Sequence, residues 1–188
     1  MPSCPADTSR SLIHTRRIEC LGYLRQDGLW DIEASLHDTK TYDFSNRDRG
    51  TIKAGEPLHG MTIRLTVDSS LLIHRAQAIT QHAPFHECPD IASAYKKLEG
   101  LTIGRGFEKH VRSHLHGPCG CTHLTELIRP LATTAIQTVM SARMDPEQPA
   151  HQKRSLPPAL MDTCYALRAE GSVAAREWPQ TDTPPGNS

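Results

Sequence analysis

Aromatic residues are scarce in this 188-residue chain, with three Phe, two Trp and four Tyr making up 5% of it. Hydrophobic residues of all kinds reach 37%, and the mean hydropathy is −0.48. No apolar run approaches the ~20 residues that a membrane span needs, so we expect no membrane association. The length fits one domain of ~150 residues with a small appendage.

An excess of either charge is also missing. Lys plus Arg number 21 and Asp plus Glu number 21, which gives a formal net charge of zero. This balance argues against a general nucleic-acid binder, which would carry a basic excess or stripe. The first seven residues lack the basic and apolar regions of a secretory signal, so we expect a cytoplasmic, reducing environment.

Histidine and cysteine are the residues that the chain has in quantity. It contains eleven His and six Cys, and residues 82–123 hold six of those His and three of those Cys. Imidazole and thiolate are ligands for zinc, iron and other borderline or soft metals. The composition therefore points to a metal or thiol site.

The distribution of proline, glycine and polar residues predicts five segments. These are a disordered tail over 1–12, a single α+β domain over 13–143, a Pro-rich linker over 144–158, a small β-hairpin annex over 159–179 and a disordered tail over 180–188. Cys164 opens the annex, and only a fold-back of the annex would bring it to a site in the main domain.

The first half of the domain has the period of antiparallel strands. Segments 17–25 and 29–42 flank Asp27-Gly28, a dipeptide typical of hairpin turns. Apolar and polar residues alternate over 30–37 and again over 61–68, and a turn then leads into 71–80. We expect two hairpins in one sheet.

The second half has the period of helices, predicted over about 89–100, 106–116 and 121–143. Pro89 suits a first helical position, and Pro130 should kink or break the last helix. Strands followed by helices predict an α+β fold with three C-terminal helices packed on one face of an antiparallel sheet.

The sharpest cluster of reactive residues is Cys119-Gly-Cys121-Thr-His123-Leu-Thr-Glu126 at a predicted helix start. A helix N-terminus favours a thiolate, and residues three apart share a face. Cys121 and His123 are therefore candidate metal ligands, and Glu126 is a candidate acid–base group. The alternative is a buried Cys121 beside a locally hydrogen-bonded His123.

Other candidates lie in separate segments. Cys88 precedes Pro89 in a loop that also holds His82 and His86, where a solvated loop is the alternative. Asp31 and Glu33 share the polar face of a predicted strand and would serve as acid–base groups if something covered that face. His59, taken alone, is more typical of a surface histidine.

Several strings resemble a bacterial family of unknown function over about 13–178. They include His14-Thr-Arg-Arg17, Asp27-Gly-Leu-Trp-Asp-Ile-Glu-Ala34, Asp38-Thr-Lys40 and Gly120-Cys-Thr-His-Leu124. More distantly, residues 54–140 resemble the IscU/NifU-type iron–sulfur cluster scaffolds. Gly55-Glu-Pro57-Leu-His59, Cys88 with the following Ile91-Ala-Ser93, and Cys121 stand where the scaffolds carry their ligand segments.

The scaffold resemblance implies that three distant segments converge on one site. Its metal ligands would be His59, Cys88, Cys121 and His123, and the cofactor would be zinc or iron, including an iron–sulfur cluster. A metal-binding domain of IscU-like fold is the leading hypothesis. A metal-dependent enzyme acting on a small organic substrate, with Asp31, Glu33 or Glu126 as acid–base partner, is the first alternative. The second is a metal-free interaction domain.

The same hypotheses leave the partner open. A small molecule, another protein and a second copy of this chain all remain compatible with the sequence.

Overall fold

The computed structural model describes residues 8–142 and 160–177. The chain divides into two compact units, Met1–Met144 and Asp145–Ser188. Within the described residues, no helix is both long and apolar enough to cross a membrane.

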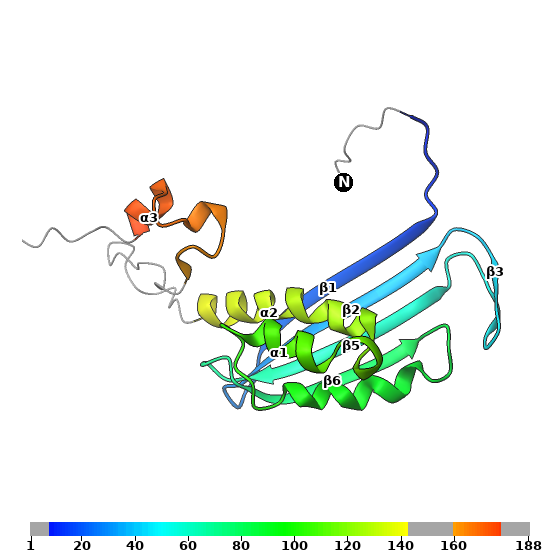
Figure 1. Ribbon diagram of the computed structural model, residues 1–188, viewed down its shortest axis with the longest axis horizontal. Coiled ribbons are helices and arrows are strands. Elements are labelled where there is room, and N and C mark those ends of the chain that lie inside the picture. Colours follow the sequence, from blue (N-terminus) through cyan, green and yellow to red (C-terminus); the bar gives the residue numbers. More distant parts are fainter. Residues whose placement is uncertain (1–7, 143–159, 178–188) are drawn as a thin grey trace, which may run out of the picture. The chain divides into compact units, whose positions relative to one another are not determined.

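A four-stranded antiparallel sheet forms the centre of the first unit (Figure 1). Its strands lie in the order β1-β2-β5-β6 and have the bounds β1 (His14–Leu24), β2 (Trp30–Lys40), β5 (Pro57–Val67) and β6 (Ile73–His82). Both expected hairpins are present, and Gly28 takes the positive φ that the first turn requires. The short strands β3 (Phe44–Asn46) and β4 (Gly50–Ile52) form a second small sheet that the sequence did not predict.

Three helical segments follow the strands and cover one face of the sheet, as Figure 1 shows. They are the 3-10 helix η1 (Cys88–Leu98), α1 (Phe107–His114) and α2 (Thr122–Ala142), with the single turn η2 (Gly117–Cys119) before α2. The predicted α+β class, with an antiparallel sheet and several helices, is thus confirmed. The helix α2 continues through Pro130, so the break considered for that position does not occur.

The core lies between the sheet and these helices because both contribute one apolar face. Ile32, Ala34 and Leu36 of β2 are fully buried, and so are Leu127 and Leu131 of α2. The strand residues follow a period of two and the helix residues a period near four, as burial on one side of each element requires.

Helix α2 packs closely against β1 at Gly22. A Cβ atom at this position would lie 2.2 Å from Oγ1 and 2.6 Å from Cγ2 of Thr138 in α2. Glycine therefore allows α2 to pack tightly over the edge strand, and the first turn of the same helix reaches the candidate site.

We expect Gly22→Ala to destabilise the first unit by roughly 1–3 kcal/mol, because an added methyl group in a packed layer forces side chains or backbone apart. Thr138→Ala in the same chain should recover part of that loss. Thermal and urea denaturation measure both effects. Gly104→Ala is the matched control, since a Cβ there would have no neighbour within 4 Å; an equal loss in the two single variants would contradict the packing argument.

The second unit contains helical turns where a hairpin was predicted, so that prediction was wrong. Tyr165–Leu167 forms the 3-10 turn η4, and Ser172–Glu177 forms helix α3. The residues after Gly171 are mostly good helix formers, and Ala175 N–H donates to the Gly171 carbonyl in a helical pattern. Cys164 is exposed. The predicted linker over 144–158 and the tail over 180–188 lie outside the described residues, as does most of the tail over 1–12.

Candidate metal centre

Asp38 is a carboxylate on the buried face of the sheet. Ile32, Ala34 and Leu36 point into the core, and the alternation of β2 places Asp38 at the next core-facing position. Its side chain is only 1% exposed. Because an unpaired buried carboxylate is strongly destabilising, Asp38 requires partners that compensate its charge.

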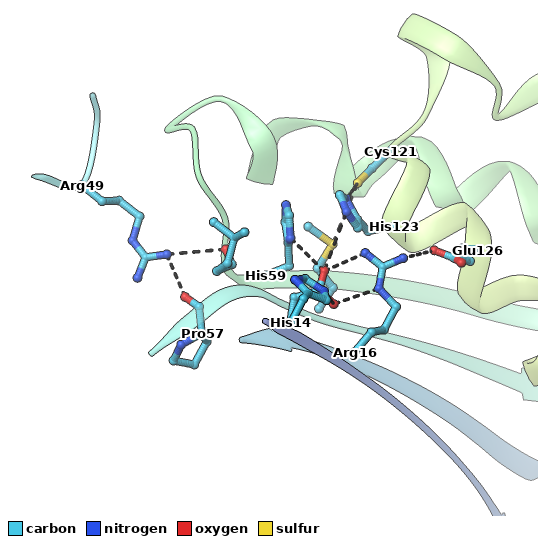
Figure 2. Close-up of polar contacts among 11 residues, drawn as sticks. His14, Arg16, Arg49, Pro57, His59, Cys121, His123 and Glu126 are labelled. Atoms are coloured by element: carbon cyan, nitrogen blue, oxygen red, sulfur yellow. Dashed lines mark hydrogen bonds and ion pairs between the residues drawn. The ribbon is translucent and has the colours of Figure 1, made fainter. Parts of the chain in front are cut away.

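Arg16 is the main partner of Asp38. The two residues face one another across β1 and β2. The guanidinium donates from Nε to Oδ1 at 2.8 Å and from Nη2 to Oδ2 at 2.7 Å, a two-bond pairing that matches the carboxylate geometry. Its Nη1 donates to Oε2 of Glu126 at 2.5 Å. Arg16 is therefore held between a strand carboxylate and a helix carboxylate (Figure 2).

Two histidines complete the cluster from other elements. His59 lies opposite Asp38 on β5, and its Nδ1 is 3.0 Å from Oδ2 of Asp38. His123, in the first turn of α2, stacks on His59 with 3.8 Å between ring centroids, and its Nε2 is 4.0 Å from the same Oδ2. One ligand atom from each of Asp38, His59 and His123 lies within 4.8 Å of the others.

The surroundings favour the protonation states that bind a metal. Burial alone would raise the pKa of Asp38, but hydrogen bonds and charge from Arg16, together with His59, lower it to about 2. Burial and the neighbouring His123 lower the pKa of His59, while burial and Arg16 lower the pKa of His123. Near neutral pH the cluster therefore offers an ionised carboxylate and two neutral imidazoles.

Cys121 lies next to this cluster, on the side of His123 that faces away from Asp38. The Cys121 thiol is 4.0 Å from Nδ1 of His123, the nitrogen that faces away from Asp38, and 3.9 Å from the sulfur of Met61. The hydroxyl of Tyr95 fixes the backbone here, because it accepts from the Cys121 N–H and donates to the Cys121 carbonyl oxygen. Cys121 is thus next to the cluster without sharing its centre.

Cys88 lies further along the same surface. It is the first residue of η1 and lines a surface depression together with Phe85, Gly120 and Cys121. Among the described residues it does not belong to the group of close ligand atoms formed by Asp38, His59 and His123. The sequence-based ligand set of four therefore divides into two histidines that meet and two cysteines that lie beside them.

Two of the three acid–base candidates lie elsewhere. Asp31 and Glu33 alternate with the buried residues of β2, so they face away from Asp38. Asp31 accepts from Thr66 at 2.7 Å, and Glu33 pairs with Arg64 at 2.6 Å. The third candidate, Glu126, contacts the site through Arg16 and is about half exposed.

Asp38, Arg16 and His14 were not predicted as site residues. His14 approaches Oδ1 of Asp38 at 3.3 Å from the start of β1. The sequence does carry one signal for Asp38, since an acidic residue continues the apolar phase of Ile32, Ala34 and Leu36. The signals for Arg16 and His14 are long-range, because only the strand register brings them to Asp38.

Fold and site together define an α+β domain whose antiparallel sheet and covering helix enclose a carboxylate–histidine cluster. Residues 14–137 match the family described as "Protein of unknown function (DUF2889)", and the chain belongs to this family. The matched range contains every residue of the cluster. No curated protein and no solved structure matches the chain.

We expect Asp38→Asn to lower the free energy of unfolding at neutral pH by roughly 3 kcal/mol, because it leaves the Arg16 charge without its buried partner. Asp31→Asn, at a half-buried position on the other face, should cost under ~1 kcal/mol, because the amide oxygen can still accept from Thr66. Urea denaturation of the two variants at the same pH makes the comparison, and equal losses would contradict the central place of Asp38.

Protonation of the Asp38 carboxyl should make the folded protein less stable in acid. Its folded-state pKa of about 2 lies below the usual 3.8 of an aspartate, so its stabilisation is complete above about pH 5 and is lost as the pH falls toward 2. Roughly 2 kcal/mol should disappear over that range in the wild type and not in Asp38→Asn. Parallel pH dependences in the two proteins would contradict the assignment.

Proposed function

We propose that this domain binds a single zinc or iron ion through Asp38, His59 and His123. The observation that carries the proposal is the convergence of three ligand atoms within 4.8 Å from β2, β5 and α2. Ligand atoms ~2.0–2.2 Å from one ion stand roughly 3–4 Å apart, and the Asp38–His59 and Asp38–His123 contacts measure 3.0 and 4.0 Å.

The donor set supports this choice of metal. Two imidazoles and one carboxylate are typical of mononuclear iron sites and of catalytic zinc sites. An ion between these groups would take the place of the proton that His59 shares with Asp38. Two carboxylates, Asp38 and Glu126, surround the single guanidinium of Arg16, so the excess negative charge favours a cation.

Arg16 is compatible with the ion as an outer partner. A carboxylate offers about four lone-pair positions, so Asp38 can accept from Arg16 and still present an oxygen to a metal. Hydrogen bonds of this kind orient metal-binding carboxylates in general. Arg16 would then hold Asp38 in place, with Glu126 retaining its own contact to Nη1.

We also propose that the fold of this domain is similar to that of the IscU/NifU-type scaffolds, which the sequence distantly resembles. The order of β5, β6, the loop with Cys88 and the helices that end with Cys121 before α2 supports it. Two departures favour a retained ion over a transferred cluster. Met61 replaces the aspartate associated with cluster release, and a Cβ at Gly120 would lie 2.2 Å from the Leu115 carbonyl oxygen. The scaffold histidine before the last cysteine therefore has no room here.

A metal-dependent enzyme is the second candidate, and one observation favours it. Three protein ligands leave coordination positions open to water or substrate. Glu126 lies at the rim of the site and is free to contact solvent on one side, which suits an acid–base group for a small organic substrate. We place either activity in the cytoplasm, where the five unpaired cysteines of the described residues would stay reduced.

The test is metal analysis of protein purified without oxygen. We expect close to one zinc or iron per chain, and a fall of about 100-fold or more in affinity in His123→Gln and in His59→Gln, since each removes one of three ligands. Cys88→Ser should bind normally. The matched control is His110→Gln with His114→Gln, a stacked histidine pair on α1, with 4.0 Å between ring centroids, that lies outside the group of close ligand atoms.

Three outcomes would overturn the mononuclear site. If the chain stays metal-free and keeps its stability in chelator, the Asp38 network is purely structural. A red-brown chromophore lost in Cys121→Ser would favour an iron–sulfur cluster. Metal content that falls equally in the α1 double variant would indicate adventitious binding. Circular dichroism checks that each variant is folded.

A further inference from the structure

The two edges of the main sheet are treated differently. At the β6 edge, the segment after η1 pairs with the first residue of the strand: Ile73 N–H donates to the Leu101 carbonyl at 2.8 Å, and Gly100 N–H donates to the Ile73 carbonyl at 2.8 Å. At the β1 edge, no other segment of the described residues forms a ladder. Long open edges of this kind are sites for pairing with another chain.

The β1 edge presents a regular row of backbone groups. The Ile13 carbonyl accepts from Thr41 and the Arg25 N–H donates to Leu29, so odd-numbered residues direct their backbone groups toward β2. Even-numbered residues from His14 to Leu24 therefore direct theirs outward, whereas the Leu12 carbonyl already accepts from the Thr41 hydroxyl. This row contains no proline and no lysine, two of the residues that proteins use to protect an edge.

Large apolar side chains gather along the same edge. Leu12 and Leu24, at its two ends, are 68% and 63% exposed, and Ile13, Ile18, Leu21 and Tyr23 between them are also exposed. Because side chains alternate between the two faces of a strand, Leu12, Ile18 and Leu24 lie on one face of this edge and Ile13, Leu21 and Tyr23 lie on the other. Exposed apolar residues gathered at an open edge in this way mark an interaction surface.

We propose that β1 pairs antiparallel with β1 of a second copy of the chain, around a two-fold axis at Ile18, to form an eight-stranded sheet. Ile18 then faces itself, and its outward N–H and carbonyl groups form a hydrogen-bonded pair. Leu12 faces Leu24 of the partner subunit, and Ile13 faces Tyr23 of the partner subunit. Exposed apolar residues thereby face one another at the centre and at both ends of the paired strands.

Charge selects this register. With the axis at Ile18, Arg17 faces Glu19 of the partner subunit, twice by symmetry. Moving the axis to Glu19 or to Arg17 would place two identical charges opposite one another, which is destabilising. Both side chains are exposed, and neither forms an ion pair within the described residues, so both are free to pair across the interface.

Charge reversal tests the register directly. Arg17→Glu and Glu19→Arg should each weaken the dimer by about tenfold or more, because each turns two attractive cross-strand pairs into repulsive ones. The double variant should recover the dimer. An equimolar mixture of the two single variants should form a heterodimer, since every facing pair is then opposite in charge. Analytical ultracentrifugation of the full chain gives the populations.

Arg75→Glu, a charge reversal on the exposed side of the other edge strand β6, is the control and should leave the dimer unchanged. Three results would overturn the proposal. These are a wild-type chain that is monomeric at tens of micromolar, a dimer insensitive to both single reversals, and a dimer weakened equally by Arg75→Glu.

Discussion

The buried pair of Asp38 and Arg16 is the interaction on which the rest of the site depends. A strand that otherwise sends apolar residues into the core sends a carboxylate there, and a carboxylate 1% exposed must be neutralised. The cross-strand register of β1 supplies the guanidinium and that of β5 supplies His59. Helix α2 then covers the pair with His123 and Glu126, and its close approach over Gly22 fixes the depth at which it lies.

This arrangement joins the two proposals without making one depend on the other. Arg16 belongs to β1, the strand whose outer edge carries the self-complementary row, so a second copy paired there would hold in place the strand that orients Asp38. The centre itself is complete within one chain, because Asp38, His59 and His123 all come from the same unit. A monomer would therefore keep the metal site, and a chain without metal would keep the edge.

Local sequence patterns predicted most of the fold but only part of the site. Alternation over residues 30–37 and 61–68 and the helical stripe of α2 predicted the sheet and its cover, because burial of one face leaves a period in the sequence. His123 was found through its place beside Cys121 at a predicted helix start, and His59 was found through a distant resemblance. Arg16 was missed because its pairing with Asp38 over 22 residues leaves no local spacing. Asp38 was missed although it continues the apolar phase of β2. The annex was misread because a glycine turn can precede a helix as well as a strand.

X-ray absorption spectroscopy of the zinc- or iron-loaded chain tests the central claim most directly. The account predicts a first shell of nitrogen and oxygen atoms only, at ~2.0–2.2 Å, with the outer scattering of two imidazole rings. His123→Gln should lose one of those rings while Cys121→Ser leaves the spectrum unchanged. A sulfur shell at ~2.3 Å would contradict the account, because it would move the metal from the carboxylate–histidine cluster to the cysteines.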